Sequence, residues 1–120
     1  MAWRRKIPET DFARLQRWCA SKVPPHRRHE VRIECHIRGT VVTLCESRPD
    51  WGGDGGWRHR KFFQLRYDVE AREWRLYYYK WRTDRWGRYR RGDTYYSGSM
   101  ARTLDEVDFN AERIFAPERF

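Results

Sequence analysis

The alternation of hydrophobic and polar residues predicts a sheet in the middle of the chain. Apolar and polar side chains alternate over residues 31–38, and basic or polar side chains alternate with apolar ones over residues 62–69 and 74–81. A period of two is typical of strands, because successive side chains leave opposite faces of the sheet. We therefore predict an α+β domain with a mostly antiparallel five-stranded sheet. Its first two strands form a hairpin and its last three form a meander.

A different spacing, that of amphipathic helices, appears at both ends of the chain. Thr10 is a suitable N-cap for a helix over residues 11–23, whose apolar residues recur at helical spacing. Thr103 and Glu106 fit a capping box, which predicts a short C-terminal helix beginning at Leu104. The predicted order is therefore helix, five strands, helix.

The first hairpin is centred on Arg38-Gly39, a tight-turn candidate. This register pairs Cys35 with Val42 and places Cys35 on the inner face. Cys45 then faces the opposite way, so a disulfide between these two cysteines is excluded.

The meander follows from two polar turns of four residues, at 70–73 and 82–85. The first turn pairs Val69 with Trp74, and the second pairs Trp81 with Trp86 and therefore Tyr77 with Arg90. A slip by one residue would exchange the two faces. One face then collects basic and aromatic side chains: Phe62, Arg66, Tyr77, Tyr79, Trp81, Trp86, Arg88 and Arg90. The pattern leaves open whether a helix covers this face.

Length and charge narrow the class of partner. A chain of 120 residues makes a single domain over 1–120, with a loose basic N-terminus at 1–7 and a Gly-rich loop at 47–57. The net charge of +9 favours a polyanionic partner or an acidic protein. The three cysteines lack a Cys-x-x-Cys spacing, and there is no apolar run for a signal peptide or membrane span. We expect a cytoplasmic protein without a membrane partner.

Aromatic residues make up 17% of the chain, and this content directs the functional interpretation. Bases stack on aromatic side chains while arginines bind the phosphates. We expect a non-catalytic module that binds RNA or single-stranded DNA through the basic-aromatic face, or an accessory subunit of a protein–nucleic acid complex. The alternative is a protein-interaction or self-associating subunit, because tyrosine and tryptophan also suit protein interfaces. The oligomeric state does not follow from the sequence.

A catalytic role is the less favoured interpretation. Glu34 and His36 fall on one face of their strand, with Arg32 beside them. A small basic nuclease could use such a glutamate, histidine and arginine as base, acid and phosphate-binding group. Alternating polar residues give the same pattern on any exposed strand. The histidine spacings match no standard metal-ligand pattern, so we expect neither a metal site nor a cofactor.

Several short segments of the C-terminal half occur together in one known family. They are Arg48-Pro49-Asp50-Trp51, Leu65-Arg66-Tyr67, Trp74-Arg75-Leu76-Tyr77, Arg85-Trp86-Gly87-Arg88-Tyr89, Leu104-Asp105-Glu106-Val107-Asp108 and Ile114-Phe115. In this order and spacing they resemble the bacterial domain of unknown function (DUF) 3024 family. The chain departs from the family pattern in its glycines at 52–56 and in its C-terminal residues. The resemblance implies one compact bacterial domain and no assigned activity.

Overall fold

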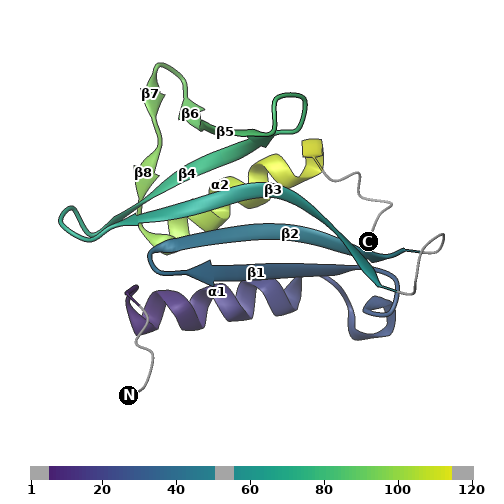
Figure 1. Cartoon of the computed structure of the whole chain (residues 1–120). Coiled ribbons are helices and arrows are strands. Elements are labelled where there is room, and N and C mark those ends of the chain that lie inside the picture. Colours follow the sequence, from purple (N-terminus) through teal and green to yellow (C-terminus); the bar gives the residue numbers. More distant parts are fainter. Residues whose placement is uncertain (1–5, 51–55, 115–120) are drawn as a thin grey trace.

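The computed structural model describes residues 6–50 and 56–114, and it confirms the predicted α+β class. An N-terminal helix, an antiparallel sheet and a C-terminal helix follow one another along the chain (Figure 1). The main strands lie side by side in the order β1-β2-β3-β4-β5. The elements are α1 Glu9–Ser21, the 3-10 turn η1 Pro25–Arg27, β1 Arg32–Arg38, β2 Val41–Pro49, β3 Trp57–Asp68, β4 Glu73–Lys80, β5 Arg85–Arg88, β6 Arg90–Arg91, β7 Thr94–Tyr95, β8 Ser97–Gly98 and α2 Met100–Ile114.

Both helices pack on the same side of the sheet, which we call the inner face (Figure 1). The indole nitrogen of Trp74 in β4 donates to Asp11 in α1 at 2.9 Å. Buried apolar side chains from the sheet and the helices fill the layer between them, namely Leu15, Val42, Leu44, Phe63, Leu65, Trp74, Leu76, Met100, Leu104 and Val107. The opposite side, the outer face, is therefore left without a helix in the described part of the chain.

The two helices begin earlier than predicted. α1 starts at Glu9 after Pro8, which supplies no side-chain cap, so Thr10 lies inside the helix. Acidic residues in the first turn suit the positive end of the helix dipole instead. α2 starts at Met100, where Ser99 Oγ accepts a hydrogen bond from the backbone N–H of Arg102 at 3.3 Å. Serine caps a helix as well as threonine does, so the capping box at Thr103 was the wrong start signal.

The predicted hairpin registers are each wrong by two residues. The turn of the first hairpin lies one residue later than expected, and the two turns of the meander lie one residue earlier. In the meander turns Arg72 and Asp84 take the left-handed backbone conformation, with φ of 56° and 54°. Neither turn has a glycine at that position to mark it in the sequence. A shift of two preserves the face of every side chain, because side chains alternate with a period of two. The observed pairs include Cys35–Leu44, Asp68–Glu73, Leu65–Leu76 and Tyr79–Trp86.

A β-bulge interrupts the pairing of β2 with β3. Leu44 pairs with Phe63 and Cys45 pairs with Lys61, so Phe62 is the extra residue. Phe62 is 4% exposed and belongs to the core, which removes it from the exposed face where the alternation had placed it. Residues 57–61 change phase with respect to 63–68 for the same reason.

The ends of the predicted loops also differ from the structure. β2 continues to Pro49 and β3 begins at Trp57, so residues 47–49 and 57 belong to strands. Residues 51–55 of the predicted loop and residues 1–5 of the predicted N-terminal segment lie outside the described residues. Ile7 is 4% exposed and packs in the core.

The edge of β4 is shared by two short strands. β5 pairs with Tyr77–Lys80, whereas β8 pairs with Trp74 and Arg75 near the other end of β4. Between them the chain leaves the sheet as the β6–β7 hairpin. Arg88 therefore pairs with Tyr77. Arg90, which was predicted to pair with Tyr77, lies in the β6–β7 hairpin instead.

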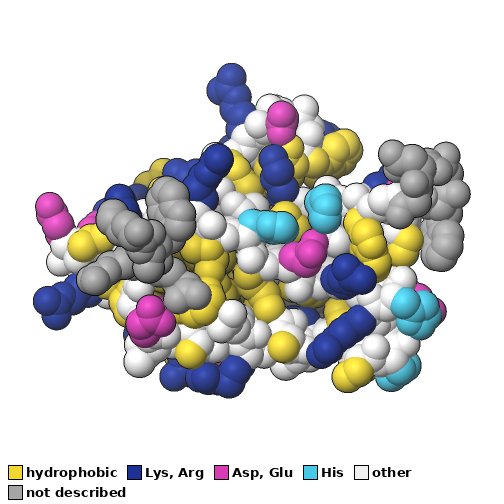
Figure 2. Space-filling view, turned by 60° about the horizontal axis from the view of Figure 1, so that its bottom comes forward, with side chains coloured by type: hydrophobic (Ala, Val, Ile, Leu, Met, Phe, Trp, Pro, Cys, Tyr) yellow, Lys and Arg dark blue, Asp and Glu magenta, His cyan; other side chains and the backbone are white. Residues whose placement is uncertain are grey.

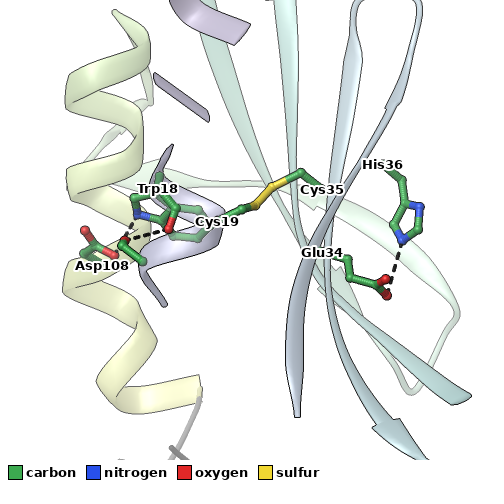
Figure 3. The surroundings of a disulfide bond; sticks show 7 residues. Trp18, Cys19, Glu34, Cys35, His36 and Asp108 are labelled. Carbon is green, nitrogen blue, oxygen red and sulfur yellow. Dashed lines mark hydrogen bonds and ion pairs between the residues drawn. A yellow bond between two sulfur atoms is a disulfide. The ribbon is translucent and has the colours of Figure 1, made fainter. Parts of the chain in front are cut away.

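A disulfide joins Cys19 of α1 to Cys35 of β1, with 6.7 Å between their Cα atoms (Figure 3). Cys45 lies on the other face, as predicted, and is a buried free thiol. Cys35 and Cys45 are thus unpaired with each other, as predicted, whereas the pairing of Cys19 with Cys35 was not predicted from the sequence. No helix in the described residues is long and apolar enough to cross a membrane.

Candidate functional site

The outer face carries aromatic rings with cationic side chains lying over them. The guanidinium of Arg66 in β3 lies 3.8 Å from the ring centre of Tyr77 in β4. The ammonium of Lys61 lies 5.4 Å from the ring centre of Tyr79, two residues further along β4. Such stacking fixes the cation over the ring while the charged group remains able to bind an anion.

The row of aromatic rings continues with further side chains on β5 and in the β6–β7 hairpin. Tyr79 pairs with Trp86, and their ring centres are 5.2 Å apart. Arg88, which pairs with Tyr77, places its guanidinium 4.6 Å from the ring centre of Tyr95. The guanidinium of Arg90 lies 5.2 Å from that same ring. The row of stacked cations therefore extends beyond the sheet edge through Tyr95.

The predicted site residues are thus only partly brought together. Arg66, Tyr77, Tyr79, Trp86 and Arg88 are neighbours on paired strands, as expected. Arg90 joins them through Tyr95, whereas Phe62 is buried by the bulge. Trp81 does not pair with Trp86, because β4 ends at Lys80, and its side chain is 74% exposed in the following turn.

A hollow at one end of β3 and β4 gathers several of these groups. It has a volume of about 540 Å³ and lies between the two strands and the turn after β4. Its lining consists of Arg60, Lys61, Phe62, Tyr78, Tyr79 and Trp81. Aromatic walls with two basic residues beside them can hold a planar ring next to an anionic group.

The second cluster on the outer face is formed by Glu34, His36 and His59. His59 Nδ1 lies 3.2 Å and His36 Nε2 lies 3.8 Å from Glu34 Oε1. Figure 3 shows that Glu34 and His36 point away from Cys35, on the far side of β1 from α1. Figure 2 shows two histidine side chains beside an acidic one on the surface, with basic side chains nearby.

Ser47 of β2 contacts both Glu34 and His59. Its hydroxyl is fully buried and donates a hydrogen bond to Glu34 Oε1. His59 Nδ1 lies 2.7 Å from the same hydroxyl oxygen. Because the single proton of Ser47 goes to Glu34, the ring nitrogen of His59 donates to Ser47 in this arrangement.

Electrostatics in this cluster favour the ionised carboxylate. Burial pushes the pKa of Glu34 upward, but the hydrogen bond from Ser47 and the nearby His59 and His36 outweigh it, so the pKa is lowered. The neighbouring thiol shows the opposite shift. Burial and the charge of Glu34 raise the pKa of Cys45, so it stays a neutral thiol.

The catalytic trio suggested by the sequence is rearranged. Arg32 lies with its guanidinium 3.7 Å from the ring centre of Trp57, so it is stacked rather than paired with Glu34. His59, which was not among the predicted catalytic residues, is the third side chain of the cluster in place of Arg32. The pairing of β2 with β3 brings it next to Ser47, and no local spacing signals that contact.

Comparison with protein-family models identifies a family whose function is unknown. The family model described as "Domain of unknown function (DUF3024)" matches residues 4–117. No curated protein and no solved structure matches the chain.

Proposed function

Since the chain belongs to the DUF3024 family, a family of unknown function, we propose its function from the outer face: it binds single-stranded nucleic acid. The observation that carries the proposal is that Lys61, Arg66 and Arg88 lie over tyrosine rings on or beside the outer face, which no helix of the described residues covers. Bases would stack on the free aromatic surfaces and phosphates would bind the cations. The proposal includes no chemical step.

The charges on this face differ in how far they are neutralised inside the protein. Arg75 forms an ion pair with Asp68 at 2.7 Å, so its charge is largely compensated. Arg66 instead donates from Nε to the uncharged side-chain oxygen of Gln64 at 2.7 Å. Arg66 therefore retains its full charge for a phosphate, while its position is fixed by Gln64 and Tyr77.

The hollow beside Trp81 supplies the place where one base would be held most tightly. Its rings offer stacking surface, and each stacked base contributes roughly 1–3 kcal/mol. Arg60 and Lys61 lie at the same hollow, where they would meet the phosphate of that nucleotide.

A protein partner is the second candidate, because Trp81 at 74% and Tyr95 at 50% are more exposed than large rings usually are. If these rings are buried in another protein or in a second copy of the chain, the binding affinity should depend only weakly on salt. The two candidates therefore differ in their response to ionic strength.

We further propose that the protein acts in the cytoplasm, where thiols are usually kept reduced. Cys19 and Cys35 would then be thiols in the cell and would pair on oxidation. Alkylation of the cysteines at lysis, followed by mass spectrometry, tests this placement: a bond already formed in cells would contradict it.

The function is tested by fluorescence anisotropy with labelled single-stranded RNA and DNA of mixed sequence. Binding should weaken as salt rises, with log K falling by about 0.7 per log unit of salt for each phosphate contacted. Arg66→Ala should lower the affinity and reduce this slope by about the contribution of one phosphate.

Arg17→Ala is the matched control, because it removes an equal charge from an exposed position on α1. It should change the binding far less than Arg66→Ala. Equal effects of the two substitutions would mean that only net charge matters and would contradict a site on the outer face. Binding that ignores salt would favour the protein partner.

A further inference from the structure

Three side chains on the outer face bring metal-binding atoms together without a metal-binding sequence motif. Glu34 and His36 come from β1, and His59 comes from β3, with β2 between them. One oxygen of Glu34 and one nitrogen of each histidine lie within 4.8 Å of one another. From this geometry we propose that Glu34, His36 and His59 bind one divalent transition-metal ion of the zinc class.

The distances between these atoms suit a shared ion. Tetrahedral zinc with ligands at roughly 2.0–2.1 Å separates neighbouring ligand atoms by about 3.3 Å. Glu34 Oε1 is 3.2 Å from His59 Nδ1 and 3.8 Å from His36 Nε2. The widest of the three separations is at most 4.8 Å, so it must close by no more than about 1.5 Å to match tetrahedral zinc. Rotation of the exposed histidine side chains allows this shift.

The donor set selects the kind of ion. Two imidazole nitrogens and one carboxylate oxygen suit Zn²⁺ and its neighbours such as Co²⁺ and Fe²⁺. Mg²⁺ and Ca²⁺ prefer sites made of oxygen atoms, so they should bind weakly here. The side chains of His36 and His59 are 56% and 51% exposed, which leaves the remaining coordination positions open to water or a ligand.

Ser47 would orient the carboxylate. It is fully buried, and its hydroxyl donates to Glu34 Oε1 while contacting His59 Nδ1. When the metal binds, it replaces the proton on Nδ1, and the bond from Ser47 to Glu34 remains. Partners that orient metal ligands in this way typically change metal affinity by about 10–100-fold.

The site is tested by isothermal titration of untagged, metal-stripped protein with Zn²⁺. One ion should bind per chain, and Co²⁺ should give the visible absorption of a site with nitrogen and oxygen ligands. His59→Ala and Glu34→Gln should each weaken Zn²⁺ binding by more than about 100-fold, and Ser47→Ala by about 10–100-fold. Mg²⁺ should show no comparable binding.

His29→Ala is the matched control. His29 lies 3.6 Å from Glu30 in an exposed pair that has no third ligand within the described residues. Its substitution should leave Zn²⁺ binding unchanged. If His29→Ala weakens binding as much as His59→Ala does, or if the folded wild type binds no Zn²⁺, the proposal is wrong.

Thermal unfolding keeps the test valid for variants that fold poorly. Zn²⁺ should raise the melting temperature of the wild type, since a ligand that binds only the folded state stabilises it. It should leave the melting temperature of folded His59→Ala and Glu34→Gln unchanged. An equal rise in these variants would overturn the site. Nucleic acid binding is measured separately, so either proposal can fail without the other.

Discussion

The indole Nε1 of Trp18 in α1 donates a hydrogen bond to Asp108 in α2, with 3.0 Å between the atoms (Figure 3). Lys22 of α1 forms an ion pair with the same carboxylate. These contacts join the two ends of the chain and hold both helices on the inner face. The exposure of the outer face, on which both proposals rest, follows from this arrangement.

Trp18→Phe is expected to destabilise the protein by about 1–2 kcal/mol. The substitution removes the donor while keeping a ring, and the bond accepted by a charged carboxylate is worth more than a neutral one. Lys22 still compensates the charge of Asp108, so a larger loss is not expected. Urea unfolding of the two proteins measures the difference. A stability equal to that of the wild type would show that this bond does not hold the helices together.

The disulfide should stabilise the oxidised protein. Cys19 and Cys35 are separated by 16 residues, and closing a loop of this size contributes about 3 kcal/mol in the chain-entropy account. Cys19→Ser should therefore lower the unfolding midpoint, and reductant should lower that of the wild type similarly. Cys45→Ser is the control, because Cys45 is a free thiol and reductant should still act on that variant. A wild type that does not respond to reductant would contradict this prediction.

Tyr79→Ala separates a binding role from a packing role. The ring contacts Trp86 and its hydroxyl bonds to Asp84, but it does not belong to the core. Stability should fall by about 1 kcal/mol, whereas single-strand affinity should fall by about 1–3 kcal/mol. Melting curves and anisotropy titrations measure the two effects.

Phe109→Ala is the control for that experiment, since Phe109 is a 64% exposed ring on α2. Its removal should leave nucleic acid affinity almost unchanged. Wild-type affinity in Tyr79→Ala would end the proposal that this ring stacks a base.

Asp68 should contribute to the pH dependence of stability. Its carboxylate accepts hydrogen bonds from the backbone of Ala71 and Glu70 and pairs with Arg75. The bond from Ala71, aided by Arg75 and Glu70, lowers the pKa of Asp68 below its ordinary value of 3.8. The folded state therefore favours the ionised form.

The sign of the effect follows by linkage. The contribution of Asp68 is fully present above pH 3.8 and is lost as the pH falls through the lower folded-state pKa. The stability difference between wild type and Asp68→Asn should be constant near neutral pH and narrow below pH 3.8. Unfolding midpoints across this range provide the measurement. A gap that widens in acid would contradict the assigned shift.

Local patterns were sufficient for the faces of the strands but not for their pairing. Alternation placed Arg66, Tyr77 and Tyr79 on one face because that property depends only on a period of two. The partner of each residue depends on where the turn lies. Gly39 marks one turn, with φ of 62°, but Arg72 and Asp84 adopt similar conformations without any glycine to signal them.

The site shows a similar division. Glu34 and His36 could be grouped from the sequence because they are two positions apart in one strand. His59 and Ser47 join them only through the pairing of β1 with β2 and of β2 with β3. Phe62 was misplaced because the bulge that buries it is a feature of two strands together, not of one.

By itself the sequence determined the fold class, the order of the two helices and the five main strands, the family and the basic-aromatic composition of one sheet face, but not the short strands β6, β7 and β8. These properties depend on neighbours along the chain and on the segments shared with the family. Tertiary structure alone decided that both helices lie on the inner face, that Cys19 meets Cys35 and that His59 meets Glu34. Such contacts join residues far apart in sequence, and their free energy depends on how whole elements pack, which no local pattern records.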